Sequence, residues 1–308
     1  MRTDSTVESL VTKEKNMTPT RTLVVISAAA LLGLGLASCS AEAPGTGDGK
    51  PATGSFGQCE LTGEAGSIEL DTLTKDTLTV ATVLPSNGWW NGTSPETIDS
   101  GFEYCMTANI AHRAGLSTLK LQNQSWDQLI SASNTTYDLG MAAITITDER
   151  KEVFDFSEPY FESNLGVAIR EGDDVTEANI RDKKVGVLQG NMGAQYTTET
   201  LKPAGGVQQF QAEVEMFTAL RAGQIDAVIT DTTLALSNTA ASGGELVVTG
   251  QFSVDQSYGI ITEKGGKNSA AVSAAIADMR EDGTLDALSA EWLTPLFGAD
   301  PNQIPVWK

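Results

Sequence analysis

The alternation of apolar and polar positions beyond about residue 73 divides the chain into strands and helices in turn. Short runs of apolar and β-branched residues predict strands at residues 78–83, 139–144, 184–189 and 224–230. Apolar residues at helical spacing, with suitable boundary residues, predict helices at residues 102–114, 126–132, 215–222, 270–280 and 284–293. Strands that alternate with helices predict a parallel-rich α/β fold.

Two of these helix–strand units resemble each other. Each consists of a helix, a short turn, an aspartate (Asp138 or Asp226) and a buried strand. Ala143 and Asp231 lie five residues beyond these aspartates, at the carboxyl ends of the strands, where open α/β sheets bind ligands. The repetition suggests two similar lobes that face each other across a cleft. The alternative is that any two such units look this alike.

The segment from Tyr137 to Tyr160 contains one residue that its local structure does not favour. Thr147 is a good helix N-cap, and the acidic residues that follow it suit a first helical turn. Arg150 is unfavourable there, because its cation opposes the positive end of the helix dipole. An arginine beside free backbone N–H groups predicts an anion site. The alternative is a surface ion pair with Asp148 or Glu149.

Composition excludes several classes of function. The formal net charge of −20 and the pI near 4.3 argue against nucleic acid and against electrostatic binding to anionic lipid. His112 is the only histidine, which excludes His-based metal clusters and disfavours a His-dependent catalytic triad. No CxxC, GxSxG or phosphate-loop pattern is present. We therefore expect neither a metal nor a cofactor.

The beginning of the chain has the pattern of a secretion signal. The apolar run at residues 23–37 is too short to span a bilayer comfortably and suits a signal peptide covering residues 1–38. Residues 1–16 are unlike the start of a signal, which makes Met17 the expected true start and Arg21 its positive charge. The residues that end at Cys39 resemble a lipobox, so we expect Cys39 to carry lipid. The alternative is an ordinary signal peptide with a chance cysteine.

A flexible region is expected between the signal and the folded body. Residues 40–58 are rich in Gly, Pro, Ala and Thr, and we assign residues 39–72 to the lipidated cysteine, a tether and an N-terminal extension. Without Cys39, two cysteines remain in an oxidising compartment, which predicts a disulfide between Cys59 and Cys105. The alternative is a pair of free buried thiols.

An ordered set of sequence blocks resembles the bacterial extracellular solute-binding proteins for polar amino acids. The blocks are residues 78–81, 88–90, 101–103, 126–160, 185–190, 223–231, 258–260 and 279–284. The resemblance implies a two-lobed fold of the type II periplasmic-binding kind, each lobe a mixed, mainly parallel sheet flanked by helices, with a ligand cleft between the lobes. It places residues 73–161 and 258–308 in lobe I and residues 162–257 in lobe II. The hinge is expected near residues 161–163 and 253–258.

The resemblance also assigns roles to residues of the cleft. Arg150 would bind the α-carboxylate of an amino acid, helped by backbone N–H groups near Thr145 and Met192. Asp231 would accept from the α-ammonium, together with the Thr145 hydroxyl and the Ala143 carbonyl. A planar cationic fork and a set of acceptors are the groups that such a zwitterion requires. The alternative for Asp231 is a helix N-cap, and both roles can coexist.

The side chain of the ligand is less well defined by the sequence. Trp126, Trp89 and Trp90 occupy positions where the family places aromatic residues around the ligand, although each could instead pack in the core. Asn191 is a further expected contact, in a position where Ser or Thr is common. Residues 83–86 lack the acidic side chain that binders of basic amino acids often have, which weakens the case for a cationic ligand.

The function implied is a substrate-binding lipoprotein of an ABC importer, held by lipid on the outer face of the cell membrane. It would act as a monomer and deliver a polar amino acid to a membrane permease with a cytoplasmic ATPase. One alternative is a secreted enzyme of the same fold that resembles the dehydratases of prephenate or arogenate. Another alternative is a sensor that uses the same module for signalling.

Overall fold

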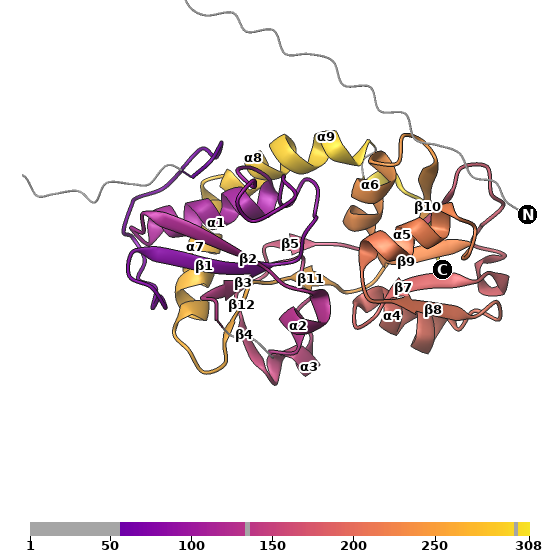
Figure 1. Cartoon of the computed structure of the whole chain (residues 1–308), viewed down its shortest axis with the longest axis horizontal. Coiled ribbons are helices and arrows are strands. Elements are labelled where there is room, and N and C mark those ends of the chain that lie inside the picture. Colours follow the sequence, from indigo (N-terminus) through magenta and orange to yellow (C-terminus); the bar gives the residue numbers. More distant parts are fainter. Residues whose placement is uncertain (1–55, 133–135, 299–300) are drawn as a thin grey trace, which may run out of the picture. The chain divides into compact units, whose positions relative to one another are not determined.

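The computed structural model describes residues 56–132, 136–298 and 301–308. They form two α/β lobes, each built on its own mixed sheet, which confirms the predicted fold class (Figure 1). The predicted signal peptide, Cys39 and the tether up to residue 55 lie outside the described residues. Within the described ranges, no helix has the length and apolar character needed to cross a bilayer.

Lobe I is built on the sheet β2-β1-β3-β12-β4. Strand β1 pairs in parallel with β2 and β3, whereas β12 runs antiparallel to β3 and β4. The strands are β1 (Thr77–Thr82), β2 (Thr118–Asn123), β3 (Leu139–Gly140), β4 (Phe154–Phe156) and β12 (Ile261–Glu263). The helices are α1 (Phe102–Arg113), α2 (Trp126–Ile130), α3 (Asp148–Lys151), α7 (Asn268–Glu281), α8 (Thr284–Leu288), η3 (Ser289–Leu293) and α9 (Thr294–Phe297).

Lobe II is built on the sheet β13-β10-β6-β9-β7-β8. Strand β7 is parallel to β8 and β9, and β6 is antiparallel to β9 and β10. The strands are β6 (Leu165–Arg170), β7 (Val185–Leu188), β8 (Val207–Phe210), β9 (Ala227–Asp231), β10 (Leu246–Phe252) and β13 (Val306–Trp307). The helices are η1 (Ile180–Asp182), α4 (Met192–Tyr196), η2 (Thr197–Leu201), α5 (Glu213–Arg221) and α6 (Thr232–Ala240), with η4 (Pro301–Gln303) preceding β13.

Two crossing segments connect the lobes where the sequence predicted a hinge. Strands β5 (Phe161–Glu162) and β11 (Ser257–Tyr258) pair with each other as an antiparallel ribbon and belong to neither large sheet (Figure 1). The rings of Phe161 and Tyr258 stack at a centroid distance of 5.8 Å. This pairing couples the two crossing segments, so both must bend together if the lobes move.

The C-terminal strand corrects the predicted lobe boundary. Residues 258–308 were expected in lobe I, but β13 pairs in parallel with β10 of lobe II. The reason is the fit of Trp307 over Gly250, where an added Cβ would lie 2.1 Å from the indole ring. Gln251 also donates to the carbonyl groups of Pro301 and Ile304, at 2.9 and 3.0 Å. The last residues therefore belong to lobe II.

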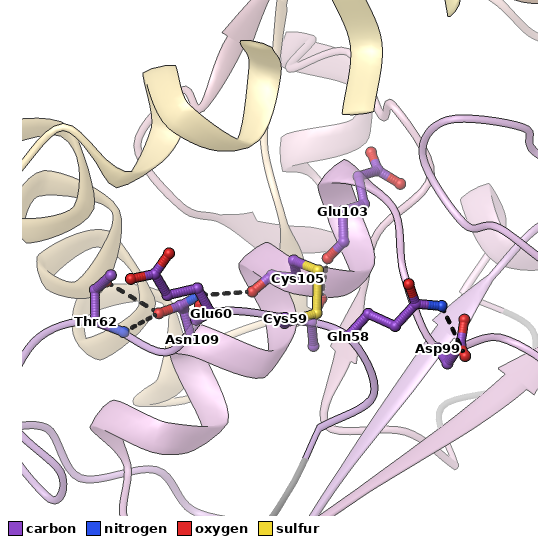
Figure 2. The surroundings of a disulfide bond; sticks show 9 residues. Gln58, Cys59, Glu60, Thr62, Asp99, Glu103, Cys105 and Asn109 are labelled. Atoms are coloured by element: carbon purple, nitrogen blue, oxygen red, sulfur yellow. Dashed lines mark hydrogen bonds between the residues drawn. A yellow bond between two sulfur atoms is a disulfide. The ribbon is translucent and has the colours of Figure 1, made fainter. Parts of the chain in front are cut away.

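The start of the folded body also differs from the prediction. It was expected near Leu73, but Phe56 is already buried in the core of lobe I, at 4% exposure. The predicted disulfide between Cys59 and Cys105 is present and attaches this segment to α1 (Figure 2). Asn109 then accepts from the Thr62 backbone N–H at 2.8 Å. Residues 56–72 thus pack on lobe I, and the tether prediction fails for residues 56–58.

Candidate functional site

Arg150 lies on the short helix α3, at the edge of lobe I. The predicted cap is present, because the Thr147 hydroxyl accepts from the Arg150 backbone N–H at 3.2 Å. The side chain is buried, and its guanidinium donates to the Thr145 carbonyl at 2.8 Å and to the Gly190 carbonyl at 2.9 Å. The second of these bonds crosses from lobe I to lobe II. The predicted alternative of a surface ion pair does not hold, since the partner of Asp148 is Lys151, at 3.3 Å.

The environment of Arg150 keeps its charge at neutral pH. Burial lowers the pKa of Arg150 to about 10, and the charges of Asp231 and Glu149 act in the opposite direction. The guanidinium carbon lies 5.2 Å from the centre of the Trp126 ring, which is within cation–π range. Arg150 is therefore a buried cation whose hydrogen-bond partners are neutral carbonyl groups.

Asp231 ends strand β9 in lobe II and is 5% exposed. Its Oδ2 accepts from the Tyr258 hydroxyl at 2.8 Å, whereas Oδ1 has no hydrogen-bond partner among the described residues. Burial raises the pKa of Asp231, while the Gln256 amide, the Tyr258 hydroxyl and the Arg150 cation lower it. The Gln256 amide is close enough to act on this pKa without forming a hydrogen bond of normal geometry. Asp231 precedes α6, but its side chain makes no capping bond.

Ala143 has a left-handed backbone conformation beyond the end of strand β3. The strand ends at Gly140, whereas the extended run was expected to continue to Ile144, and the φ of +48° at Ala143 lies outside the extended region. The Ala143 N–H donates to Glu103 Oε1 at 2.8 Å. Glu103 also accepts from the Tyr160 hydroxyl and from Trp90 Nε1. This buried carboxyl group thus holds Ala143 in place from behind.

A cavity of about 360 Å³ lies between the two lobes. Its wall includes Ala143 and Trp126 from lobe I together with Asn191 and Asp231 from lobe II. A neighbouring hollow of about 650 Å³ is lined by Arg150, Met192 and again Asn191. Most of the expected ligand contacts thus lie around two adjoining spaces, with Asn191 at the wall of both.

Asn191 and Thr145 take structural roles in addition to their place in the site. The Asn191 side chain caps α4 by accepting from the Ala194 N–H at 2.8 Å, and it donates to the Thr230 hydroxyl at 3.3 Å. Thr145 is buried, and its carbonyl accepts from Arg150 as described above. It fixes the guanidinium and is absent from the wall of the 360 Å³ cavity.

The interpretation of Trp89 and Trp90 as ligand contacts is wrong. Their exposed fractions are 1% and 0%, and neither lines the cavity between the lobes. Trp89 packs edge-on against Phe102 in the core of lobe I, and Trp90 donates to Glu103. The alternative of core packing holds for both. Trp126, by contrast, lines the cavity.

Two polar residues of the cavity were missed by the sequence analysis. Gln124 follows β2, and Glu213 is the first residue of α5. Both line the cavity with Asp231. Glu213 gave no distinctive signal, because acidic residues are common in the first turn of any helix. Gln124 preceded a predicted helix and looked like part of an ordinary loop.

The fold and the site together define a two-lobed binding protein with a ligand cavity at the carboxyl ends of its strands. The model of the bacterial extracellular solute-binding proteins, family 3, matches residues 94–295, and the chain belongs to this family. This family is extracellular, as its name states.

Known proteins similar to this chain bind amino acids. The L-cystine-binding protein TcyJ of Escherichia coli (strain K12) is 32% identical over 206 residues, which cover 65% of this chain and 75% of that protein. The ABC transporter glutamine-binding protein GlnH of Bacillus subtilis (strain 168) is 32% identical over 163 residues, covering 52% and 59%. The solved structure of an ancestral arginine-binding protein bound to arginine superimposes with a TM-score of 0.64 at 29% identity, covering 71% of this chain and 98% of that one.

Proposed function

We propose that this protein binds a free α-amino acid between its lobes and delivers it to an ABC importer. The observation that carries the proposal is the pair of opposite charges across the cleft, Arg150 on lobe I and Asp231 on lobe II. Both side chains are buried, and a carboxylate ligand is a stronger partner for Arg150 than the Gly190 carbonyl it now contacts. The free Oδ1 of Asp231 is the acceptor for the α-ammonium.

Ala143, Thr145, Asn191 and Met192 complete the proposed site. The Ala143 carbonyl and the Thr145 hydroxyl join Asp231 as acceptors, and backbone N–H groups near Thr145 and Met192 assist Arg150. Asn191 lies at the wall of both spaces, between the two proposed clamps. Trp126 lies beside the guanidinium and offers an apolar face to the ligand.

Ligand binding favours a closed arrangement of the lobes in this proposal. A ligand held by Arg150 and Asp231 makes contacts to both lobes that an open form lacks, which shifts the population towards closure. The paired strands β5 and β11 form the hinge about which the lobes turn.

The proposed setting is the outer face of the cell membrane. The relatives that bind cystine and glutamine, one of them named as part of an ABC transporter, support a transport role. The partners are a membrane permease and its cytoplasmic ATPase. A lipid at Cys39, after removal of residues 1–38, anchors the protein, which acts as a monomer.

Calorimetry tests the proposal directly. A thermal-shift screen of the twenty amino acids and cystine first identifies ligands, because a ligand that binds only the folded state raises the unfolding temperature. Arg150→Ala should then weaken binding of the best ligand by about 2–5 kcal/mol, since it leaves a buried carboxylate unpaired. Lys151→Ala, an exposed change of equal charge on the same helix, is the control and should leave the affinity unchanged.

Two outcomes would contradict the proposal. One is an affinity that Arg150→Ala leaves unaltered. The other is consumption of the ligand in the presence of the protein, monitored by NMR over hours. Consumption would favour the enzyme alternative instead.

A further inference from the structure

The cavity between the lobes carries two acidic groups and no basic one. Asp231 and Glu213 both line it, whereas its wall includes no lysine or arginine among the described residues. Arg150 lines the adjoining hollow and is assigned to the ligand carboxylate. An α-amino acid brings one ammonium, which Asp231 accepts. A ligand with a neutral side chain therefore leaves Glu213 without an opposite charge.

Glu213 lines this cavity, and its protonation depends on the charges around it. It is the first residue of α5, on the wall opposite lobe I, and is partly exposed. Burial raises the pKa of Glu213 to about 7, and the negative charge of Asp231 contributes to this rise, against a hydrogen bond from Asn238. Both carboxyl groups belong to residues that line the same cavity, where their negative charges repel each other. A cation bound beside Glu213 would relieve this repulsion.

Gln124 provides a second, independent observation on the opposite wall. It is 8% exposed, and neither its amide oxygen nor its amide nitrogen has a hydrogen-bond partner among the described residues. A buried amide without partners costs free energy, so such groups mark places where a polar ligand group fits. The amide oxygen of Gln124 is an acceptor that a cationic N–H group can use.

The wall between these polar groups is largely apolar. Leu84 of lobe I and Leu188 of lobe II contribute to it, and Trp126 adds an aromatic face. Such a wall suits the methylene groups of an unbranched side chain, which gain free energy from burial. A chain of this kind would carry a terminal charge away from the α-carbon.

We infer that Glu213 and Gln124 form a subsite for a second positive group of the ligand, an ammonium or a guanidinium carried by its side chain. This inference rests on the proposed amino-acid function and adds the class of ligand to it. Lobe II thus supplies the acidic side chain that residues 83–86 of lobe I lack. Two sources share this chemistry: a basic amino acid, and the distal ammonium of a dimeric amino acid such as cystine.

The test compares two ligands that differ in charge and little in shape. Calorimetric titration of the whole mature protein at pH 8 should show L-arginine binding at least about tenfold tighter than neutral L-citrulline, because the cation pairs with the Glu213 carboxylate at the cavity wall. Glu213→Gln should lower the arginine affinity by about 10- to 100-fold and change the citrulline affinity by less than about threefold. Glu215→Gln, an exposed change of equal charge two residues along the same helix, should alter neither.

The same titrations with L-cystine identify the source of the positive group. Arginine binding that depends on Glu213 identifies a basic amino acid, and cystine binding with the same dependence identifies a distal ammonium. The inference is overturned if arginine and citrulline bind wild type equally, or lose affinity equally in Glu213→Gln, and cystine binding does not depend on Glu213 either. If neutral amino acids bind while charged ones do not, the subsite is wrong and the proposed function stands. If no α-amino acid binds, both fail.

Discussion

Two buried carboxyl groups, Glu103 in lobe I and Asp231 in lobe II, are partnered in very different ways. Glu103 accepts three hydrogen bonds, from Ala143, Tyr160 and Trp90, so both of its oxygens are used. Asp231 accepts one, from Tyr258, and its Oδ1 has no partner in the described part of the chain. Both sites have nearly the same exposure, 1% and 5%.

The difference indicates that Glu103 stabilises the fold, whereas Asp231 has an acceptor position available for a ligand. A buried acid with all its acceptor positions filled stabilises the structure around it, here the turn at Ala143. A buried acid with an unused oxygen at a cavity wall costs folding free energy, which binding of a cation can recover. Glu103 of lobe I thus supports the cavity wall at Ala143, while Asp231 of lobe II presents a negative charge to the cavity.

The largest effect expected from this comparison is the loss of Glu103. Glu103→Ala leaves the Ala143 N–H, the Tyr160 hydroxyl and Trp90 Nε1 buried without their acceptor. At about 1–3 kcal/mol for each orphaned donor, with partial relaxation, the free energy of unfolding should fall by about 3–5 kcal/mol. Urea denaturation followed by tryptophan fluorescence measures it. A loss below about 1 kcal/mol would mean that Glu103 does not hold the turn.

Asp231 should show the reverse behaviour. Asp231→Asn keeps an acceptor for Tyr258 and removes the buried charge, so the unfolding temperature should stay within a few degrees of wild type. The affinity for an amino acid should fall by about 2–5 kcal/mol, because the α-ammonium loses its counter-charge. Calorimetric titration measures the affinity, and differential scanning calorimetry measures the stability. Large destabilisation with unchanged affinity would assign Asp231 to the fold instead.

The dependence of stability on pH should report the protonation of Glu103 once that of the other acids is cancelled by a matched variant. Burial raises the pKa of Glu103 to about 7, although its three donors lower it. Since the folded state then holds the proton more tightly than the unfolded state, this group stabilises the fold at low pH. Its contribution is lost as the pH rises from about 4.5 to about 7, by about 3 kcal/mol in total.

Glu103→Gln removes this titration, which allows a direct comparison. The free energy of unfolding of wild type minus that of Glu103→Gln should fall by about 3 kcal/mol between pH 4.5 and pH 7.5, while titration of the other acids cancels. Urea denaturation at several pH values measures this difference. A difference that stays flat would show that Glu103 is ionised in the folded protein throughout this range.

Patterns of short range predicted the repeated helix–strand units and the cap at Thr147 well. These features depend on neighbours in sequence: the apolar and β-branched run of β1 and the residues that bound α1 indicate these elements, and a hydroxyl one residue before α3 caps it. The same patterns singled out Arg150 and Asp231, since Asp231 ends the buried strand β9 and Arg150 lies in the first turn of α3, after its Thr147 cap.

The features that were missed depend on contacts distant in sequence. The sequence alone does not distinguish Trp89 and Trp90 from tryptophans that stack on a ligand. Their contacts with Phe102 and Glu103 place them in the core. Strand β13 joins lobe II because Gly250 leaves room for Trp307, a match that neither segment reveals alone. Glu213 reaches the cavity because β8 and β9 bring α5 beside Asp231, which spacing along the chain does not show.

The smallest effects come from a matched pair of tyrosines. Tyr160 donates to Glu103, and Tyr258 donates to Asp231, and both side chains are buried. Tyr160→Phe should lower the free energy of unfolding by about 1–2 kcal/mol, since Glu103 loses a donor it uses in the folded state. Its effect on ligand affinity should be small. Urea denaturation and calorimetric titration of both variants give the two quantities.

Tyr258→Phe should change affinity more than stability. Without the Tyr258 hydroxyl, Asp231 holds its proton more tightly, because burial already raises its pKa and this hydroxyl, together with the Gln256 amide and the Arg150 cation, opposes that rise. A protonated Asp231 is a poorer partner for the α-ammonium, so affinity at pH 7 should fall by about three- to tenfold and recover partly at pH 9. A loss of affinity that does not depend on pH would point to the stacking of Tyr258 on Phe161 in the hinge. Equal losses of stability in Tyr160→Phe and Tyr258→Phe would remove the distinction between Glu103 and Asp231.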